Sequence, residues 1–324
     1  MDLGVTLAGL GVGIIVGLTG MGGGALMTPL LVLFFGVAPL SAVSSDLVAS
    51  AIMKPFGSAV HLRRGTVHGG LVGWLCVGSV PAAFAGVLIA RALGSGDRVQ
   101  DVIQFALGVA LLLATAGLVV KSYIALVERA GRRARRAAGE TAASPGADGV
   151  KNLTVRPVPT VLVGVAGGVI VGMTSVGSGS LIIIALLALY PMLKANSLVG
   201  TDLVQAVPLV ASAAIAHLLF GDFRLDLTLA LLVGSIPGVF VGAQLSSRLP
   251  GGFVRRALTL VLLASGLKLL DLSNAVLVTV LAAVALAGPP LWIWARRSHG
   301  LPAFARSEPT RAESEPTELA RSDA

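Results

Sequence analysis

The sequence GLTGMGGGAL at residues 17–26 interrupts a long apolar stretch, and a related sequence, GMTSVGSGSL, follows at residues 172–181. Glycine makes a helix less stable, so each cluster predicts a break in a helix. The apolar residues after the breaks, 25–36 and 180–193, are fewer than the roughly 20 that a helix needs to cross a bilayer. We therefore expect two half-helices that begin inside the membrane.

The rest of the chain is also typical of a membrane protein. Hydrophobic residues make up 55% of the 324 residues and charged residues only 12%, whereas soluble proteins carry about 25% charged residues. These values predict an all-α polytopic membrane protein with roughly 8–11 membrane segments. The apolar segments lie at 3–19, 25–36, 40–60, 68–90, 101–120, 158–173, 180–193, 200–219, 227–247, 256–270 and 275–295.

The two glycine clusters belong to a longer internal repeat. They are 155 residues apart, and at an offset of 156 SDLV at 45–48 matches TDLV at 201–204, while GSVP at 78–81 matches GSIP at 234–237. Each copy contains five apolar segments, and this odd number predicts that the second copy is inverted across the membrane. Inverted repeats with interrupted helices recur in secondary transporters.

The repeat and the polar stretches predict the domain organisation. Four arginines and the sequence ETAASPGADG mark a hydrophilic linker between the copies, and the C-terminal end is rich in Pro and Glu, which favours disorder. The expected parts are a first transmembrane repeat at 1–121, a basic linker at 122–157, a second repeat at 158–272, an extra transmembrane helix at 273–297 and a disordered tail at 298–324.

Basic residues predict the orientation. Lys and Arg accumulate in cytoplasmic loops, so the linker, the tail and the loops with Arg63, Arg248 and Arg296 are expected in the cytoplasm of a cell with this chain in its inner membrane. The net charge of +8 does not indicate nucleic acid binding, because no stripe of basic and aromatic residues accompanies it. Only four basic residues fall on the opposite side, namely Arg91, Arg98, Arg224 and Lys268.

The two breaks are candidate sites for an anion. Unwound backbone survives inside a membrane only where protein buries it or water reaches it, and the N–H groups of a following helix attract negative charge. Close helix packing, which also collects small residues, is the alternative. The predicted substrate-binding residues are Thr19, Gly20, Gly22, Gly23, Gly24, Thr174, Ser175, Gly177, Ser178, Gly179 and Ser180.

Four ionisable residues in the apolar segments, and His61 directly after one of them, are candidates for coupling transport to a proton or a sodium ion. Asp46 and Asp202 are functional candidates because a carboxylate in a membrane is costly, although either could cap a helix. His61 and His217 could carry a proton, or could be interfacial residues at loop edges. Lys54 could face a substrate or extend to the cytoplasmic edge.

Enzyme chemistry has little support in the sequence. No Glu lies in an apolar segment, no group of Cys, His, Asp and Glu has metal-ligand spacing, and no P-loop is present. We therefore expect no catalytic residue, no bound metal and no cofactor. Two alternatives stay open at this point, a membrane enzyme that acts on a lipid phosphate and a permease for another solute.

Three stretches of the first copy resemble the TauE/SafE family of membrane permeases, also called the sulfite exporter family. They are GLTGMGGGALMTPLLVLFFGV at 17–37, SDLVASAIMKPFGSAVHLRRGTV at 45–67 and GSVPAAFAGVLIA at 78–90. The second copy departs from this pattern where GSGS replaces the glycine run. The resemblance implies an inner-membrane carrier of sulfite, sulfonates or related sulfur anions. The expected function is secondary transport of a small anion by alternating access.

Overall fold

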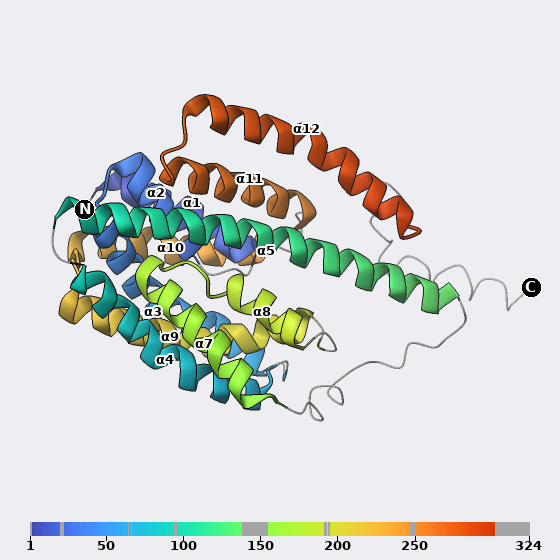
Figure 1. Ribbon diagram of the computed structural model, residues 1–324, viewed down its shortest axis with the longest axis horizontal. Coiled ribbons are helices and arrows are strands. Elements are labelled where there is room, and N and C mark those ends of the chain that lie inside the picture. Colours follow the sequence, from blue (N-terminus) through green and yellow to red (C-terminus); the bar gives the residue numbers. More distant parts are fainter. Residues whose placement is uncertain are drawn as a thin grey trace, which may run out of the picture.

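The computed structural model describes residues 2–19, 23–63, 65, 67–93, 96–137, 155–190, 193, 195–245 and 251–301, and in this part of the chain every regular element is a helix. The expected all-α class is confirmed (Figure 1). The helices are α1 Leu3–Thr19, α2 Gly24–Phe35, α3 Pro39–Arg63, α4 Gly69–Ala92, α5 Asp97–Ala137, α7 Pro157–Thr174, α8 Leu181–Leu189, α9 Ala195–Phe220, α10 Leu225–Leu245, α11 Gly251–Leu269 and α12 Asn274–Ser298.

Six of the described helices are long and apolar enough to cross a membrane. These spans lie in α4, α5, α7, α9, α10 and α12. The short apolar helices α1 and α2 flank the first glycine cluster, while α8 follows the second. With 12 residues in α2 and 9 in α8, both are shorter than a full span. The structure thus contains the two half-helices that the glycine clusters predict.

The second break has a backbone that ordinary residues rarely adopt. Gly177 and Gly179 have φ angles of 128° and 104°, a region that glycine enters without steric cost. Ser175 is left-handed as well, with φ of 59°, and it ends α7. The chain therefore leaves α7, turns through these glycines and starts α8 at Leu181.

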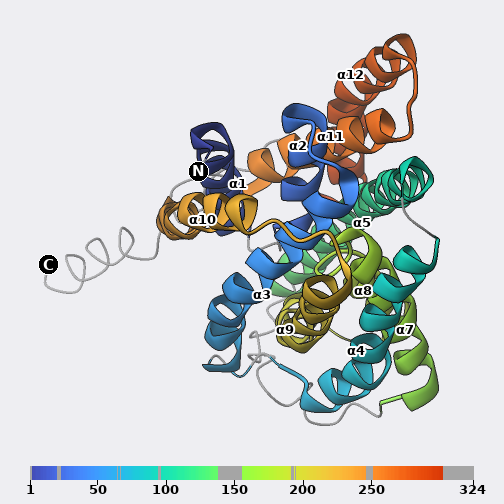
Figure 2. The same cartoon turned by 90° about the vertical axis from the view of Figure 1, so that its left-hand side faces the viewer.

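The two copies pack against each other reciprocally, so that the first helix of each copy contacts the fourth helix of the other. Helix α1 packs on α10, and α7, the equivalent of α1, packs on α4, the equivalent of α10 (Figure 2). A Cβ on Gly13 would lie 2.5 Å from the Ser235 carbonyl oxygen, and one on the equivalent Gly168 would lie 2.5 Å from that of Ser79. This reciprocity supports the duplication. The orientation of the copies across a membrane stays a prediction.

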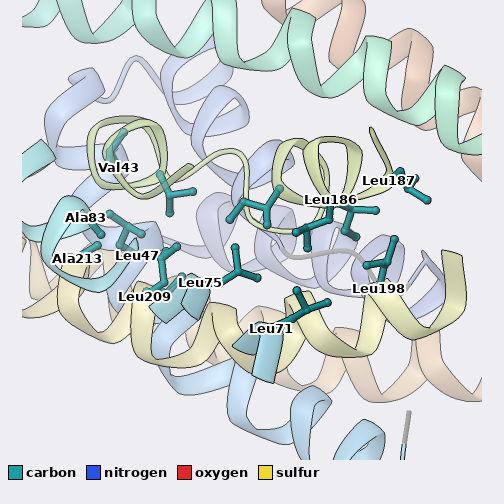
Figure 3. Packing of buried hydrophobic residues seen from close by; sticks show 14 of the residues in the cluster. Val43, Leu47, Leu71, Leu75, Ala83, Leu186, Leu187, Leu198, Leu209 and Ala213 are labelled. Carbon is teal, nitrogen blue, oxygen red and sulfur yellow. The ribbon is translucent and has the colours of Figure 1, made fainter. Parts of the chain in front are cut away.

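Helices α3 and α9 pack on each other between these two pairs, and their apolar faces help to form one of the cores. Leu47 of α3, Leu75 of α4, Leu186 of α8 and Leu209 of α9 belong to one buried cluster (Figure 3). A close-packed interior of this kind holds side chains in fixed positions. The helices that carry the ionisable residues and the short helix α8 thus share one packed core in this conformation.

Two helices differ from the expected segment ends. Helix α5 runs on to Ala137, although the predicted apolar segment ends at residue 120, and its end projects beyond the bundle (Figure 1). Ala and Arg are the commonest residues of this extension, and both favour helix. Helix α12 lies at the outside of the bundle next to α11, and none of its residues is buried. Residues 138–154 and 302–324 of the predicted linker and tail lie outside the described residues.

Candidate functional site

Asp46 and Asp202 occupy equivalent positions in α3 and α9. Each is the eighth residue of its helix, so neither stands where a capping residue stands, and the capping interpretation is wrong. Asp46 is 0% exposed and Asp202 is 1% exposed. Two carboxylates are therefore buried where the copies meet, a location that is costly without partners and that marks functional sites in membrane proteins.

Asp46 links the two halves of the protein by hydrogen bonds. Its Oδ2 accepts one from Thr28 Oγ1 of α2 at 2.9 Å and one from Ser175 Oγ, at the end of α7, at 2.6 Å. Thr28 follows the first break and Ser175 begins the second. The carboxylate thus holds the half-helix of copy one and the break of copy two on the same side of α3.

Asp202 has a different environment, although its position is equivalent. Within the described residues, neither carboxylate oxygen of Asp202 makes a hydrogen bond. Its electrostatic neighbours are Lys54 and Lys121, and the backbone amide of Gly179 lies near it. A buried carboxylate without hydrogen bonds is unusual in proteins, so both Asp202 oxygens keep the capacity to accept hydrogen bonds from a ligand or a proton donor.

Lys54 is the buried cation of the described chain. It is 8% exposed, and its Nζ donates a hydrogen bond to Ser178 Oγ in the second break. It lies within electrostatic reach of Asp202 and Asp46, but the ion pair found among the described residues joins Arg224 to Asp226 at the surface. The Lys54 side chain therefore points to the break and does not extend to the membrane edge, which excludes the alternative of snorkelling.

The second break has two ends of opposite polarity. Helix α8 begins at Leu181, and its first N–H groups carry the positive end of the helix dipole. Helix α7 ends at Thr174, where its last carbonyl groups carry the negative end. Lys54 reaches the segment before α8 through Ser178, while Asp46 contacts the end of α7 through Ser175. The positive charge of Lys54 therefore lies near the positive end of the α8 dipole, and the negative charge of Asp46 lies near the negative end of the α7 dipole.

His217 is buried completely, so the interfacial interpretation is wrong for this residue. Its Nε2 lies 2.8 Å from the carbonyl oxygen of Gly172, and its Nδ1 lies 2.8 Å from Ser44 Oγ. The ring therefore bridges α7 and α3. The equivalent His61 stands in the last turn of α3 and is partly exposed, so the two histidines differ in surroundings.

The other predicted site residues are distributed around the breaks. Gly20 and Gly22 lie outside the described residues, and Thr19 ends α1. Gly23 is the cap residue before α2, and Gly24 is the first residue of that helix. Thr174 donates its hydroxyl to the carbonyl oxygen of Ile170 in its own helix at 2.6 Å. Ser180 precedes α8 and makes no side-chain cap. Among the predicted hydroxyl residues whose side chains the structure describes, Ser175 is hydrogen-bonded to Asp46 and Ser178 to Lys54.

Comparison with known proteins shows which family this architecture belongs to. The family described as "Sulfite exporter TauE/SafE" matches residues 5–269. This chain belongs to the TauE/SafE family. It is similar to "Probable membrane transporter protein YjnA" of Bacillus subtilis (strain 168), with 39% identity over 83% of this chain and 100% of that protein. It is also similar to "Probable membrane transporter protein YdhB" of the same organism, with 27% identity over 80% of this chain and 96% of that protein. No solved structure matches.

Membership in TauE/SafE makes this chain a multi-pass membrane transporter with about six spans. The lipid-phosphate enzyme that the sequence left open is not supported, because the family and these relatives are described as exporters and transporters. The described residues contain no group of three or more His, Cys, Asp and Glu side chains that could hold a metal ion.

Several polar residues of this TauE/SafE site were missed from the sequence. Gln205 donates its amide to Ser79 Oγ at 2.5 Å, and its Oε1 is buried without a partner among the described residues. An amide three residues after Asp202 was an available signal, because uncharged polar groups in a membrane also need partners. Thr28 and Ser50 have no comparable signal, since single hydroxyls are common in apolar helices. In the part of the chain that the structure describes, the other buried side-chain atoms without a hydrogen bond are Ser45 Oγ, Ser50 Oγ, Asp46 Oδ1, both Asp202 oxygens and Ser235 Oγ.

Proposed function

We propose that this TauE/SafE protein is a secondary transporter of a small anion, namely sulfite, a sulfonate or a related sulfur oxyanion, and that it works by alternating access. The observation that carries the proposal is the contact of the buried Lys54 with Ser178 in the second break. This contact sets a cation and a hydroxyl beside the N-terminal end of a half-helix.

These groups suit an oxyanion. A lysine ammonium has three donors and no acceptor, and it binds oxyanions as a point charge. The start of α8 adds the positive end of the helix dipole, although the Leu181 N–H itself donates to the carbonyl oxygen of Gly177 at 3.1 Å. Sulfur oxyanions present several acceptor oxygens around one centre, which matches donors that converge from α3 and from the break. The sulfur substrate class is also supported by the description of the family as sulfite exporters.

The helix arrangement supports alternating access. The pairs α1–α10 and α7–α4 are equivalent contacts made in exchanged roles, and α3 packs on α9 between them. A transporter with two such related halves can rock one half against the other and open the central site to either side in turn. We also propose that the copies are inverted and that the linker and tail face the cytoplasm of an inner membrane, because basic residues concentrate there.

Flux into proteoliposomes tests this function. The purified protein is reconstituted, and uptake of radiolabelled sulfite is compared with uptake of a sulfonate, sulfate and chloride. We expect saturable sulfite uptake that other sulfur oxyanions inhibit. Lys54→Met should raise KM or lower flux by about tenfold or more, because a hydrogen bond to a charged group contributes roughly 1.5–3 kcal/mol.

Lys268→Met is the matched control. Lys268 is the exposed lysine in the last turn of α11 and contacts Asn274, so this variant should transport like the unmodified protein. Equal flux through the Lys54→Met and Lys268→Met variants would contradict the anion site. Saturable uptake of a different solute with no uptake of any sulfur anion would favour the alternative permease.

A further inference from the structure

We propose that Asp46 is the centre of a sodium site at the α7 end of the second break, whereas the anion site lies at the α8 end. The sodium ion is a transported co-substrate, and the inference rests on the transport activity proposed above. The ligands would come from α2, α3 and the end of α7. Asp46 Oδ2 already lies 2.9 Å from Thr28 Oγ1 and 2.6 Å from Ser175 Oγ.

The cluster is rich in oxygen and has spare acceptor capacity. Asp46 Oδ1 is buried and has no hydrogen bond among the described residues. Ser50 Oγ is in the same condition, and it stands one helical turn after Asp46 on the same face of α3. Ser and Thr hydroxyls keep two lone pairs each. Oxygens that are buried without partners are costly, and a bound cation would satisfy them.

The backbone adds negative charge at the same place. Helix α7 ends beside Asp46, and its terminal carbonyl groups carry partial negative charge. The absence of a side chain at Gly24 lets the start of α2 approach Ser175 and Asp46, because a Cβ there would lie 2.8 Å from Ser175 Oγ and 3.1 Å from Asp46 Oδ2. Ends of interrupted helices are places where transporters coordinate sodium.

The arrangement of charge favours a cation beside Asp46. Lys54 is within electrostatic reach of both buried carboxylates, and Asp202 has Lys121 as a second basic neighbour. An anion at Lys54 would offset the charge that balances Asp46, and unbalanced charge inside a membrane is costly. An anion therefore enters most readily together with a cation.

The chemistry of the ligands selects the kind of cation. Divalent ions such as Ca²⁺ take six to eight oxygens, and several carboxylates usually contribute. Here one carboxylate is surrounded by hydroxyl and carbonyl oxygens, which suits a hard monovalent ion. Asp202 lacks hydroxyl contacts among the described residues, so its equivalent position does not form a second cage.

The two ligands would share one structural element. Ser175 belongs to the sodium site and Ser178 to the anion site, and both lie in the short segment between α7 and α8. A sodium ion that orders Ser175 would also order the backbone that presents Ser178. We therefore expect anion transport to depend on Na⁺.

Direct binding to the purified full-length protein tests the sodium site without transport. Binding of radiolabelled Na⁺ and the Tm in NaCl are measured against equal concentrations of KCl and choline chloride. We expect saturable Na⁺ binding and a rise in Tm in NaCl alone. Asp46→Asn should abolish both effects, and Asp226→Asn, the same change at an exposed carboxylate outside the site, should keep them.

Ser50→Ala is the second variant, in case Asp46→Asn does not fold. Ser50 Oγ has no hydrogen-bond partner of normal geometry among the described residues, although it lies close enough to interact with the Asp46 carboxylate. Its removal should therefore change the fold little and raise the Kd for Na⁺ by about tenfold. Equal Na⁺ binding by the unmodified protein and both α3 variants would overturn the proposal.

Four further outcomes separate this inference from the proposed function. The same Tm in all three salts would overturn the sodium site, and a Tm that responds to pH but not to Na⁺ would do so in favour of a proton. Na⁺ binding at Asp46 without flux of any sulfur anion would overturn the proposed substrate and support the cation site. Sulfite flux that is the same with and without Na⁺ would overturn the coupling.

Discussion

Helices α3 and α9 have the same place in their copies but carry different chemistry. Asp46 accepts two hydrogen bonds from hydroxyls, whereas Asp202 accepts none among the described residues. Lys54 of α3 corresponds to Val210 of α9, which is an ordinary buried apolar residue. The duplicated scaffold is symmetric in packing, and the site that it surrounds is not.

This difference shows how the halves divide their contributions. Copy one supplies the charged side chains of α3, Asp46 and Lys54, and copy two supplies the segment between α7 and α8 with Ser175 and Ser178. The side chains of one copy therefore complete the break of the other. Movement of the copies relative to each other would change both contacts together, which is what alternating access requires.

The largest expected effect tests the symmetric part. A Cβ on Gly78 would collide with the carbonyl oxygen of Val161, and one on the equivalent Gly234 would collide with that of Thr6. Gly78→Ala and Gly234→Ala should each lower the free energy of unfolding by about 3 kcal/mol, since tight cores do not accept added methyl groups. Thermal unfolding in detergent measures both.

Gly73→Ala is the control in the same helix as Gly78. Gly73 has nothing within 4 Å of the added Cβ, so this variant should gain about 0.5–1 kcal/mol from helix propensity. A large loss at Gly78 with none at Gly234 would show that the reciprocal packing of the copies is wrong.

The second effect distinguishes the two carboxylates. Asp46→Asn removes the charge from two hydrogen bonds and should cost about 2 kcal/mol of stability. Asp202→Asn removes a buried charge without hydrogen bonds and should cost less or increase stability. Unfolding of both variants in parallel gives the comparison. A larger loss for Asp202→Asn than for Asp46→Asn would show that the environments are assigned the wrong way round.

The third effect compares the histidines. His217→Ala leaves the Gly172 carbonyl without its side-chain partner in a buried place and should cost about 1–2 kcal/mol. His61→Ala acts at a partly exposed position at the end of α3 and should cost less. Both variants are compared by Tm. An equal fall in Tm for the two would contradict the view that His217 bridges two helices while His61 does not.

The smallest effect concerns one hydroxyl. Ser178→Ala removes the hydroxyl that accepts from Lys54 and should raise the KM for sulfite a few-fold, about the effect of one hydrogen bond. Gly23→Ser introduces a hydroxyl at the equivalent position of copy one, where the added Cβ meets only ordinary contacts. Its KM should stay unchanged because Val210 replaces the lysine there. A higher KM for Gly23→Ser alone would place the anion at the first break.

Much of the fold could be predicted because it depends on local properties. Glycine clusters break helices wherever they occur, and the half-helices α2 and α8 follow from residues 17–26 and 172–181. The extension of α5 to Ala137 was missed because a basic stretch outside the apolar segment was interpreted as a linker, although its residues favour helix.

The site could be predicted only in part, because its contacts join distant parts of the chain. Lys54 and Ser178 are 124 residues apart, and Asp46 and Ser175 are 129 apart. The cost of charge in a membrane singled out Asp46, Asp202 and Lys54 without showing their neighbours. His217 stands near the end of a helix, and its burial depends on tertiary contacts such as those with Gly172 of α7 and Ser44 of α3.

Equilibrium binding of radiolabelled sulfite to the purified protein tests the central claim, that Lys54 and the second break form the anion site. The unmodified protein, Lys54→Met and Lys268→Met are compared after thermal unfolding has shown that all three are folded. We predict saturable binding with an unchanged Kd in Lys268→Met and with a Kd that is about tenfold higher or more in Lys54→Met. Unchanged sulfite affinity in folded Lys54→Met would contradict the account.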